Sequence, residues 1–264
     1  MTPSLSGHSA IVSGSTAGIG YAIAEELARQ GAAVIVNGRT QARVDAALAT
    51  LAQAVPGASL RGVAADLSTA AGAATLIAQI PQADILINNV GIFEPRAFAD
   101  IGDADWQRLF DANVMSGVRL SRHYLPGMIE RNRGRVVFIS SESALQIPVE
   151  MIHYGMTKSA QIAIASGMAQ LTRGSAVTVN SVLAGPTRSE GVGTFVEQLA
   201  RQDGISAAEF EQKFFETIRP TSLLRRFIEP VEIARFVAFV ASPAASAING
   251  AALRAEGGLV LSAF

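Results

Sequence analysis

Short, nearly continuous apolar runs alternate along the chain with stretches whose apolar residues recur at helical spacing. The runs lie at 9–14, 32–38, 60–66, 84–89, 135–140 and 176–182. The helical stretches lie at about 19–30, after 40, from 68 to about 80, at about 103–131 and at 153–171. Continuous apolar strands are typical of a parallel sheet covered on both faces. This alternation predicts an α/β fold with a doubly wound parallel sheet and helices on both faces.

Polar residues at the starts of the helical stretches indicate where two helices begin. Thr40 precedes a helix whose apolar positions include Val44 and Leu51, and Ser68 precedes the next helix. Hydroxyl side chains are favoured at such N-cap positions because they accept from free amides of the first turn. We therefore expect Thr40 and Ser68 to cap these helices.

One segment departs from the strand–helix rhythm. Residues 186–222 carry polar and Gly-rich stretches and then "AAEFEQKFFETI". Because no Pro/Ser-rich linker interrupts the chain, we predict a single domain over 1–264. Within it, 186–222 is interpreted as an insertion that covers the substrate, and an ordinary surface excursion is the alternative.

Composition narrows the classes of partner and site. The chain is 49% hydrophobic and 16% charged with a formal net charge of -1, so neither nucleic acid nor an anionic membrane is an expected partner. The N-terminus does not resemble a signal peptide, no run of about 18 apolar residues occurs, and a cytoplasmic location is expected. With no cysteine and only three dispersed histidines, no metal site is predicted.

A glycine-rich turn joins the first strand to the first helix. In "SGSTAGIG" (13–20), Gly14 allows a tight exit from the strand, and Gly18 and Gly20 allow a ligand to approach the helix N-terminus. Unpaired amides and the helix dipole at such a terminus favour a pyrophosphate. The turn therefore predicts dinucleotide binding.

The end of the second strand bears on which nicotinamide cofactor is bound. Folds that prefer NAD commonly place an acid there to hold the ribose 2′-hydroxyl, but this chain has Gly38 followed by Arg39. A guanidinium can bind a 2′-phosphate in a forked geometry. NADP(H) is therefore favoured over NAD(H), with a solvated surface role for Arg39 as the alternative.

A tyrosine and a lysine lie four residues apart in "YGMTK" (154–158), and so on one face of a helix. An ammonium near a phenol is expected to lower the phenol's pKa, which lies near 10 in isolation. Ser141, near the end of the fifth strand, offers a second donor to a carbonyl oxygen. The alternative is that Tyr154 and Lys158 are only a solvated pair on the helix surface. His153 lies about 100° around the helix from Tyr154 and is expected in the pocket wall or at the surface.

Motifs spread from residue 10 to about 258 resemble those of the short-chain dehydrogenase/reductase family. "SGSTAGIG" resembles its TGxxxGIG turn, "NNVG" (88–91) its NNAG, and "YGMTK" its YxxxK motif. "AADL" (64–67), "AGPTRS" (184–189) and "LRAEGG" (253–258) resemble further family segments, although the second has Ala-Gly-Pro where Pro-Gly is usual. Ser141 lies 13 residues before Tyr154, which is the family's usual interval.

The resemblance implies a Rossmann-type fold and an NAD(P)(H)-dependent oxidoreductase that interconverts a carbonyl and an alcohol, with Tyr154 as proton donor and acceptor. The catalytic residues it implies are Asn113, Ser141, Tyr154 and Lys158. Lys158 would also bond the nicotinamide ribose, and Asn113 would position a water that links Lys158 to solvent. The implied cofactor-binding residues are Gly14, Ser15, Thr16, Gly18, Ile19, Gly20, Arg39, Asp66, Leu67, Asn88, Val90, Gly91, Tyr154, Lys158, Gly185, Thr187 and Ser189. Asp66 would lie near the adenine, with helix capping as the alternative.

The resemblance also implies a homotetramer, or a homodimer, in which the helices at 103–131 and 153–171 pair across a two-fold axis. The expected substrate is a small molecule, and apolar residues in 142–153 and 187–219 favour a hydrophobic ketone or alcohol. These residues are Leu145, Ile147, Val149, Met151, Phe195, Phe214 and Phe215. Arg188, Glu190 or Arg219 would contradict this if they point inward. The alternative function is a non-catalytic NAD(P)-binding sensor or scaffold. A serine hydrolase is disfavoured because no G-x-S-x-G occurs.

Overall fold

A computed structural model describes residues 5–189, 193, 200–201 and 204–263. Within this part of the chain, seven strands form one parallel sheet in the order β3-β2-β1-β4-β5-β6-β7. The strands are β1 (Ser9–Val12), β2 (Ala33–Gly38), β3 (Leu60–Ala64), β4 (Ile85–Asn88), β5 (Arg135–Ser141), β6 (Thr178–Ala184) and β7 (Ala252–Ala255). The strand order reverses between β1 and β4, the position where ligands bind in sheets of this type.

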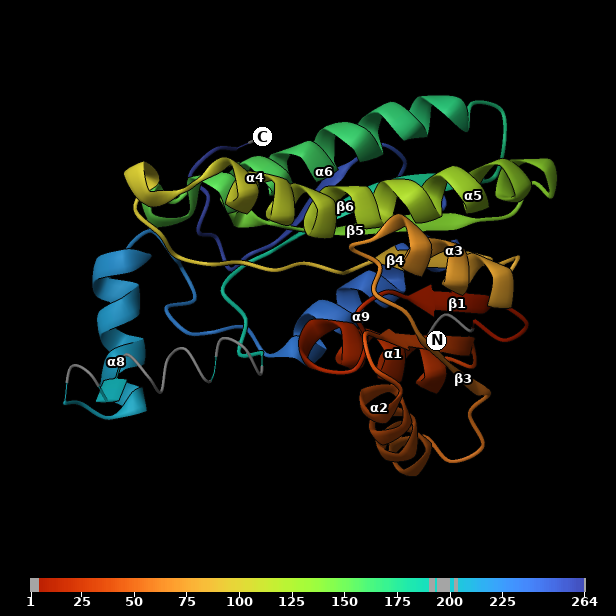
Figure 1. Cartoon of the computed structure of the whole chain (residues 1–264), viewed down its shortest axis with the longest axis horizontal. Coiled ribbons are helices and arrows are strands. Elements are labelled where there is room, and N and C mark those ends of the chain that lie inside the picture. The colour runs from red at the N-terminus through yellow and green to blue at the C-terminus, as the bar shows by residue number, and fades with distance from the viewer. Residues whose placement is uncertain (1–4, 190–192, 194–199, 202–203, 264) are drawn as a thin grey trace.

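Helices cover both faces of the sheet (Figure 1). One face carries α1 (Gly18–Arg29), α2 (Gln41–Ala54) and α9 (Pro230–Val240). The other carries α3 (Ala70–Gln79), α4 (Asp103–Phe110), α5 (Ser116–Glu130) and α6 (Ile152–Leu171). The predicted doubly wound parallel sheet is confirmed, while α9 was not predicted from the sequence.

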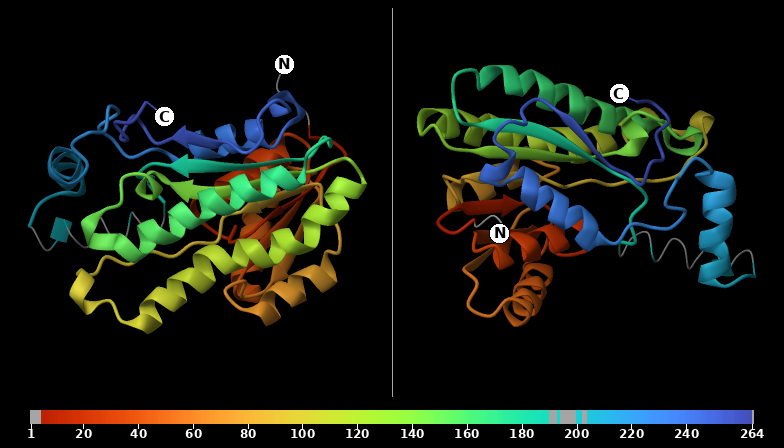
Figure 2. Two further views of the ribbon diagram at one scale, coloured as in Figure 1. Left: turned by 90° about the horizontal axis from the view of Figure 1, so that it is seen from above. Right: turned by 180° about the vertical axis from the view of Figure 1, so that it is seen from behind.

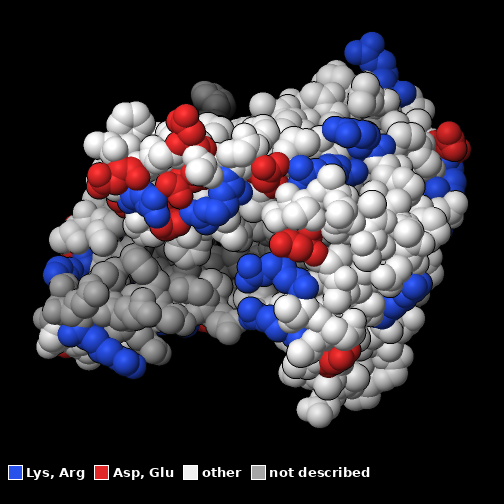
Figure 3. Space-filling model, in the orientation of Figure 1, with Lys and Arg blue, Asp and Glu red and all other residues white. Residues whose placement is uncertain are grey.

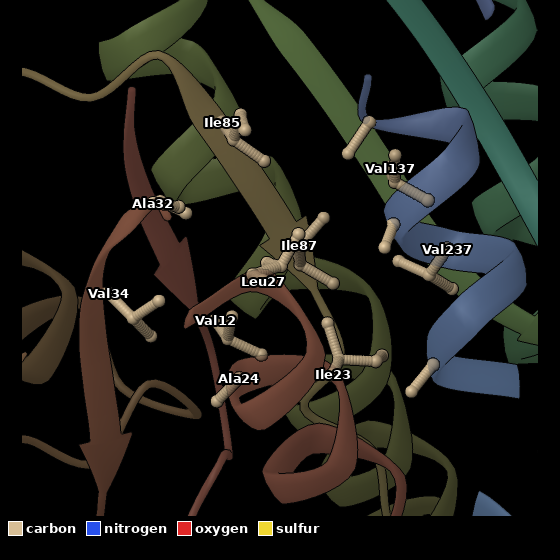
Figure 4. Close-up of a cluster of buried hydrophobic side chains, with 14 of the residues drawn as sticks. Val12, Ile23, Ala24, Leu27, Ala32, Val34, Ile85, Ile87, Val137 and Val237 are labelled. Atoms are coloured by element: carbon tan, nitrogen blue, oxygen red, sulfur yellow. The ribbon is translucent and has the colours of Figure 1, made fainter. Parts of the chain in front are cut away.

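The apolar strands form two cores because side chains alternate between the faces of the sheet. On one face, Val12, Ile87 and Val137 of the strands meet Leu27 of α1 and Val237 of α9 (Figure 4). All five are almost fully buried, and burial of each such side chain contributes about 1.5–3 kcal/mol.

The second core lies between the sheet and the α3–α5–α6 face. Phe138 of β5 is fully buried there together with Leu120 and Met128 of α5. Tyr124 of α5 is also buried, and its hydroxyl donates to the Ile80 carbonyl at 2.6 Å. Its polar end is therefore satisfied inside an otherwise apolar layer.

The helix starts agree with the sequence in one case and differ in another. Thr40 caps α2 as predicted and accepts from the Arg43 amide at 3.4 Å. The prediction that Ser68 caps α3 is wrong, because Thr69 is the cap and accepts from the Gly72 amide at 3.0 Å. Ser68 instead donates to Asp66 through both its amide and its hydroxyl, which places it in the turn before the helix.

The long helical region predicted at 103–131 contains a widened turn. A π-helical segment, Asp111–Met115, joins α4 to α5. Such π-turns often occur at functional sites, and this one carries Asn113. Among the helices of the described residues, none has the length and apolar character needed to cross a membrane.

Part of the predicted insertion packs, together with Phe227 just beyond it, into a small aromatic cluster. It contains α8 (Ala207–Lys213) and a following π-helical turn, Phe214–Ile218. The buried side chains of this cluster, with Phe214 packed against them, come from Phe210, Phe215 and Phe227. α8 lies beyond the carboxyl ends of β5 and β6, apart from the helices on the sheet (Figure 2). Its position is thus next to the edge where ligands bind in parallel sheets.

A glycine pair in α5 tests how tightly the second core is packed. A Cβ added at Gly117 would lie 2.6 Å from the buried Phe138 ring, whereas one at Gly127 would meet only the flexible end of Arg131 at 3.1 Å. Helical Gly→Ala changes ordinarily stabilise by about 0.5–1 kcal/mol. We expect Gly127→Ala to follow this rule and Gly117→Ala to destabilise by about 1–3 kcal/mol through overpacking. Urea denaturation measures both, and a stabilising Gly117→Ala would contradict the packing described here.

Candidate active site

The glycine-rich turn requires glycine at each of its three predicted positions. Gly14 and Gly18 have φ values of 62° and 58°, in the left-handed region that side chains disfavour. A Cβ at Gly20 would lie 2.4 Å from the Gly14 carbonyl oxygen. The N-cap of α1 is Ala17, whose methyl group offers no acceptor to the first-turn amides. The turn therefore fits a phosphate, which would accept from these amides.

Two asparagines that the sequence analysis missed hold this turn in place. Asn37 is buried; its side-chain oxygen accepts from the Gly14 amide at 3.1 Å, and its amide group donates to two carbonyls of the β3 region. Asn89 donates to the carbonyls of Ser13 and Gly14, each at 3.0 Å. The polar Asn37 near the end of an apolar strand was the only sequence signal for such a role. Its bonding partners lie more than 20 residues away in the sequence, so the sequence did not identify them.

Residues of three segments distant in the sequence lie against the turn. The Val90 side chain lies 3.1 Å from the position of a Cβ at Gly14, and Ser189 lies 3.2 Å from that at Gly18. Thr16 contacts the end of β2, where its methyl group is 2.4 Å from the position of a Cβ at Gly38. Figure 3 shows a hollow beside the part that carries α1 and α2, with basic side chains on that side of it.

Other predicted cofactor residues direct their side chains elsewhere. Ser15 is buried and donates to the Val12 carbonyl at 2.6 Å, Asn88 donates to Ser121 on α5 at 3.0 Å, and Leu67 belongs to the second core. These three side chains support the frame of the site, and a role in contacting the cofactor remains a prediction for them.

The remaining predicted cofactor residues are placed as follows. Arg39 and Asp66 are exposed next to the carboxyl ends of β2 and β3, and Ile19 packs on the first core. Asp66 accepts from the amide and the hydroxyl of Ser68 in the turn before α3, which resembles the capping role given as the alternative. The Asp66 side chain is nevertheless exposed and accessible to a ligand. Gly185 is pressed against the Glu256 main chain, 2.7 Å from a Cβ position.

The loop after β6 is held by its own hydrogen bonds despite the shifted proline. The Thr187 hydroxyl donates to the Gly185 carbonyl at 2.8 Å, and the Ile228 amide donates to the Pro186 carbonyl at 2.8 Å. These bonds therefore hold the loop with Ser189 next to Gly18, although the loop lacks the Pro-Gly sequence that is usual in the family.

Lys158 fastens α6 to β5 beside the predicted catalytic serine. Its Nζ is buried and donates to the Ile139 carbonyl at 2.8 Å, while the Ser140 hydroxyl donates to the Lys158 carbonyl at 2.9 Å. The Nζ lies 5.6 Å from the Tyr154 ring centroid and 3.3 Å from the position of a Cβ at Gly91. Ser141, Tyr154 and Lys158 are thus brought together, next to the loop that contacts the glycine turn.

Tyr154 is half-buried, and its pKa is displaced in the direction opposite to our expectation. Burial raises the pKa of the phenol above its ordinary value, and the negative charge of Glu142 raises it further. A hydrogen bond with Ser141 and the charge of Arg219 act in the lowering direction. The expected lowering by Lys158 is wrong for this structure: burial is the largest cause and raises the pKa, and the ammonium is bonded to main-chain and amide oxygens instead.

Glu142 is a second group that the sequence analysis missed. Its carboxylate is buried and accepts from the hydroxyls of Ser141 and Ser143, and it forms an ion pair with Arg219. Ser141 also accepts from the Ser143 amide at 3.1 Å. A lone acid after a strand gives no sequence signal for such a role, since most acids in that position are solvated.

Asn113 and Lys158 are connected through a glutamine. Gln161 accepts from Lys158 Nζ at 3.3 Å and donates to the Asn113 carbonyl at 2.6 Å. The Asn113 side chain donates to Thr157 and bonds the Ile92 main chain in both directions. Asn113 is therefore near Lys158 as predicted, but the Gln161 amide joins the two groups directly.

Three further expectations can be compared with the structure. His153 is fully buried and its ring meets that of Trp106 edge-on at 5.9 Å, so it belongs to neither the surface nor the pocket wall. Phe215 is buried in the aromatic cluster beside α8, which removes it from the predicted pocket wall, whereas Phe214 is half-buried and its ring faces Arg219. Phe195 and Glu190 lie outside the described residues.

Apolar and charged side chains both occur around the predicted pocket. Leu145, Ile147 and Val149 are exposed, and Met151 is half-buried. Arg219 points inward to Glu142, with only 11% of its side chain exposed. Within the described residues, no group of His, Asp and Glu side chains gathers to hold a metal ion.

Comparisons with known proteins agree with this geometry. A family model described as short chain dehydrogenase matches residues 8–200. An uncharacterized oxidoreductase, YvaG of Bacillus subtilis, is 49% identical over the whole of both chains. The D-beta-hydroxybutyrate dehydrogenase of Cupriavidus necator is 32% identical over 97% of this chain and 99% of that protein. L-sorbose reductase from Gluconobacter frateurii, crystallised with NADPH and L-sorbose, superposes with a TM-score of 0.93 at 28% identity, covering 99% of this chain and all of that one.

The buried ammonium of Lys158 predicts a pH dependence of stability. Burial lowers the pKa of Lys158 from 10.5 to about 8. Between these values the unfolded chain holds the proton and the folded chain does not, so this group makes stability rise with pH there. Relative to Lys158→Met, the unfolding free energy of the wild type should rise by at most about 1.4 kcal/mol per pH unit. Urea denaturation of both proteins across this range tests the expectation, and parallel pH curves would contradict it.

Proposed function

Because the chain belongs to the short-chain dehydrogenase family, we propose that this oxidoreductase interconverts a carbonyl compound and an alcohol, with Tyr154 as proton donor and acceptor. The observation that carries the proposal is the meeting of Ser141, Tyr154 and Lys158 at the carboxyl end of β5. The loop containing Val90 and Gly91 joins this group to the glycine turn. A dinucleotide bound against that turn would supply or take up the hydride.

Each side chain has a distinct part in the proposed reaction. In reduction, the Tyr154 phenol gives its proton to the carbonyl oxygen, and in oxidation the phenolate takes a proton from the alcohol. Ser141 turns its hydroxyl hydrogen from Glu142 toward the same oxygen and stabilises the developing charge. Lys158, an ammonium with three donor hydrogens, keeps one on the Ile139 carbonyl and offers another to the cofactor ribose. Asn113 lies in the π-turn; its side chain donates to Thr157 and its carbonyl accepts from Gln161, and both of these residues lie on α6 next to Lys158.

Packing at the end of β2 supports a preference for NADP(H). At position 38, where an acid would hold the ribose 2′-hydroxyl, a Cβ would lie 2.4 Å from the Thr16 methyl group and 3.2 Å from Val44. No acidic side chain fits there unless Thr16 moves. The next residue, Arg39, is exposed and can reach a 2′-phosphate. The bound NADPH of L-sorbose reductase agrees with this assignment.

The proposed substrate is a small ketone or alcohol with an apolar part and at least one further polar group. Leu145, Ile147 and Val149 provide the exposed apolar surface. The inward Arg219 and the buried Glu142 provide charge, which modifies the expectation of a purely hydrophobic substrate. A substrate screen should therefore contain both apolar ketones and small hydroxyketones such as ketoses.

Two further predictions belong to this proposal. The segment 186–222 is proposed to cover the substrate, since α8 lies beyond the carboxyl ends of β5 and β6.

Self-association into a homotetramer or homodimer through α5 and α6 is proposed because α6 exposes small residues in its later turns. Ala163, Ser166 and Gly167 are such residues: the first two are of a size that permits close helix packing, and a Cβ at Gly167 would meet no atom within 4 Å.

Removal of the Tyr154 hydroxyl tests the proton-transfer role. Tyr154→Phe keeps the ring and its edge-on contact with Phe93, so the fold and NADPH binding should persist. Turnover should fall by about 100- to 10,000-fold, the usual contribution of general acid–base catalysis. NADPH absorbance with the ketone screen measures turnover, and fluorescence titration measures binding. An active Tyr154→Phe protein would refute the assignment. Cofactor binding by a wild type that turns over no substrate would favour a sensor.

Removal of the Arg39 guanidinium tests the cofactor preference. If Arg39 binds the 2′-phosphate, Arg39→Ala should weaken NADPH by about 1.5–3 kcal/mol, the range of a hydrogen bond to a charged group, and should barely affect NADH. Fluorescence titration of both cofactors measures this without turnover. Arg43→Ala, one helical turn away in α2, serves as the comparison. An equal loss for NADPH and NADH would show that Arg39 does not read the phosphate.

A further inference from the structure

The side chain next to the proposed catalytic serine is a buried acid that the proton-transfer scheme above does not use. Glu142 follows Ser141 directly at the end of β5 and is 5% exposed. One carboxylate oxygen accepts from the Ser141 hydroxyl, and the other accepts from the Ser143 hydroxyl at 3.1 Å. The negative charge is therefore bonded to the group that must later donate to the substrate oxygen.

The positive partner of this acid comes from the insertion rather than from the sheet. Arg219 follows the π-helical turn Phe214–Ile218, and its Nε lies 3.7 Å from Glu142 Oε1. Its Nη1 donates to Glu150 at 3.2 Å, and its guanidinium lies 5.8 Å from the Phe214 ring centroid. Contacts with Glu142, Glu150 and Phe214 thus hold the arginine at the carboxyl end of β5.

A buried acid at this position is costly if its only role is structural. An apolar or amide side chain of similar size would avoid the desolvation of a charge. A negative charge close to a phenol also disfavours the phenolate that alcohol oxidation needs. The arrangement is therefore workable only while a cation offsets the acid, and the cation belongs to a different part of the chain.

We propose that Glu142 and Arg219 form a positioning pair for Ser141 and Tyr154, in which Arg219, from the turn after α8, balances the acid at the end of β5. Glu142 orients the Ser141 hydroxyl, and Arg219 offsets the acid's charge at Tyr154. The proposal rests on the assignment of Tyr154 as the proton-transfer residue, but the electrostatic part can be measured without turnover. The opposing effects of the two charges on the pKa of Tyr154 agree with it.

The other charged groups around Tyr154 are fixed in known positions. Lys158 Nζ lies 5.6 Å from the phenol ring, and Glu150 is bonded to Arg219. His153, the next residue on α6, packs against Trp106, and burial lowers its pKa. None of these groups is altered in the variants below, so opposite shifts can be assigned to Glu142 and Arg219.

The test removes each charge separately with an amide of similar size. Glu142→Gln should move the alkaline midpoint of the Tyr154 phenolate to lower pH, and Arg219→Gln should move it to higher pH, each on the order of one pH unit. The double variant should return toward the wild type. Phenolate absorbance reports the midpoint without substrate, because the chain has only three tyrosines and the spectrum of the matching Tyr154→Phe protein can be subtracted.

The same variants should show the pair in the reaction. The pH profile of alcohol oxidation rises as Tyr154 ionises, so its limb should shift to lower pH in Glu142→Gln and to higher pH in Arg219→Gln. Arg219→Lys keeps the charge and should lie near the wild type, even if Arg219→Gln folds poorly. Arg226→Gln, which removes an exposed arginine paired with Glu232, should leave the profile unchanged.

The outcomes separate this proposal from the proposed function. Shifts of the same sign, or no shift in either single variant, would overturn the positioning pair even if the wild type is an active reductase. Opposite phenolate shifts in a protein that turns over no carbonyl or alcohol would support the pair and refute the proposed function. Circular dichroism of each variant confirms that the fold is retained.

Discussion

The attachment of α6 to β5 is the contact on which the candidate site depends. Lys158 Nζ donates to the carbonyl of Ile139, and the neighbouring Ser140 hydroxyl donates back to the Lys158 carbonyl. These two reciprocal hydrogen bonds fix the position of α6 along the axis of β5. Ser141 at the strand end and Tyr154 one turn earlier on the helix therefore meet. A small change in the position of α6 would separate them, although each side chain would keep its own secondary structure.

The same burial that gives this contact its strength works against the chemistry of the phenol. Inside the protein, both the phenolate of Tyr154 and the ammonium of Lys158 are disfavoured, and their pKa values are displaced in opposite directions. Charges must therefore be supplied at short range. In this chain Glu142 and Arg219 are such charges, and one of them lies outside the sheet-and-helix framework.

The sequence was sufficient for those features that depend on local pattern. Continuous apolar runs predicted the parallel sheet, and the spacing of Ser141, Tyr154 and Lys158 predicted their meeting. The helix α9 was not predicted, although Ile233, Ala234, Val237 and Ala238 recur at helical spacing in "VEIARFVAFV" and form its buried face. The bonding of Asn37 and Gln161 could not be predicted, since their partners are fixed only by tertiary packing. The predicted direction of the Tyr154 pKa shift was wrong because burial and the charge of Glu142 both raise this pKa, and neither effect can be found from the Tyr–Lys spacing.

The contact between Thr16 and the end of β2 has a consequence for how such a protein can change over evolutionary time. A Cβ at position 38 would lie 2.4 Å from the Thr16 methyl group, while Thr16 itself belongs to the glycine-rich turn. An acid at position 38 therefore requires the Thr16 side chain to move or to be replaced by a smaller residue. A change of cofactor by way of this strand end would thus also disturb the glycine-rich turn. Selection for a different coenzyme would then more readily act on the exposed Arg39 and its neighbours than on the strand.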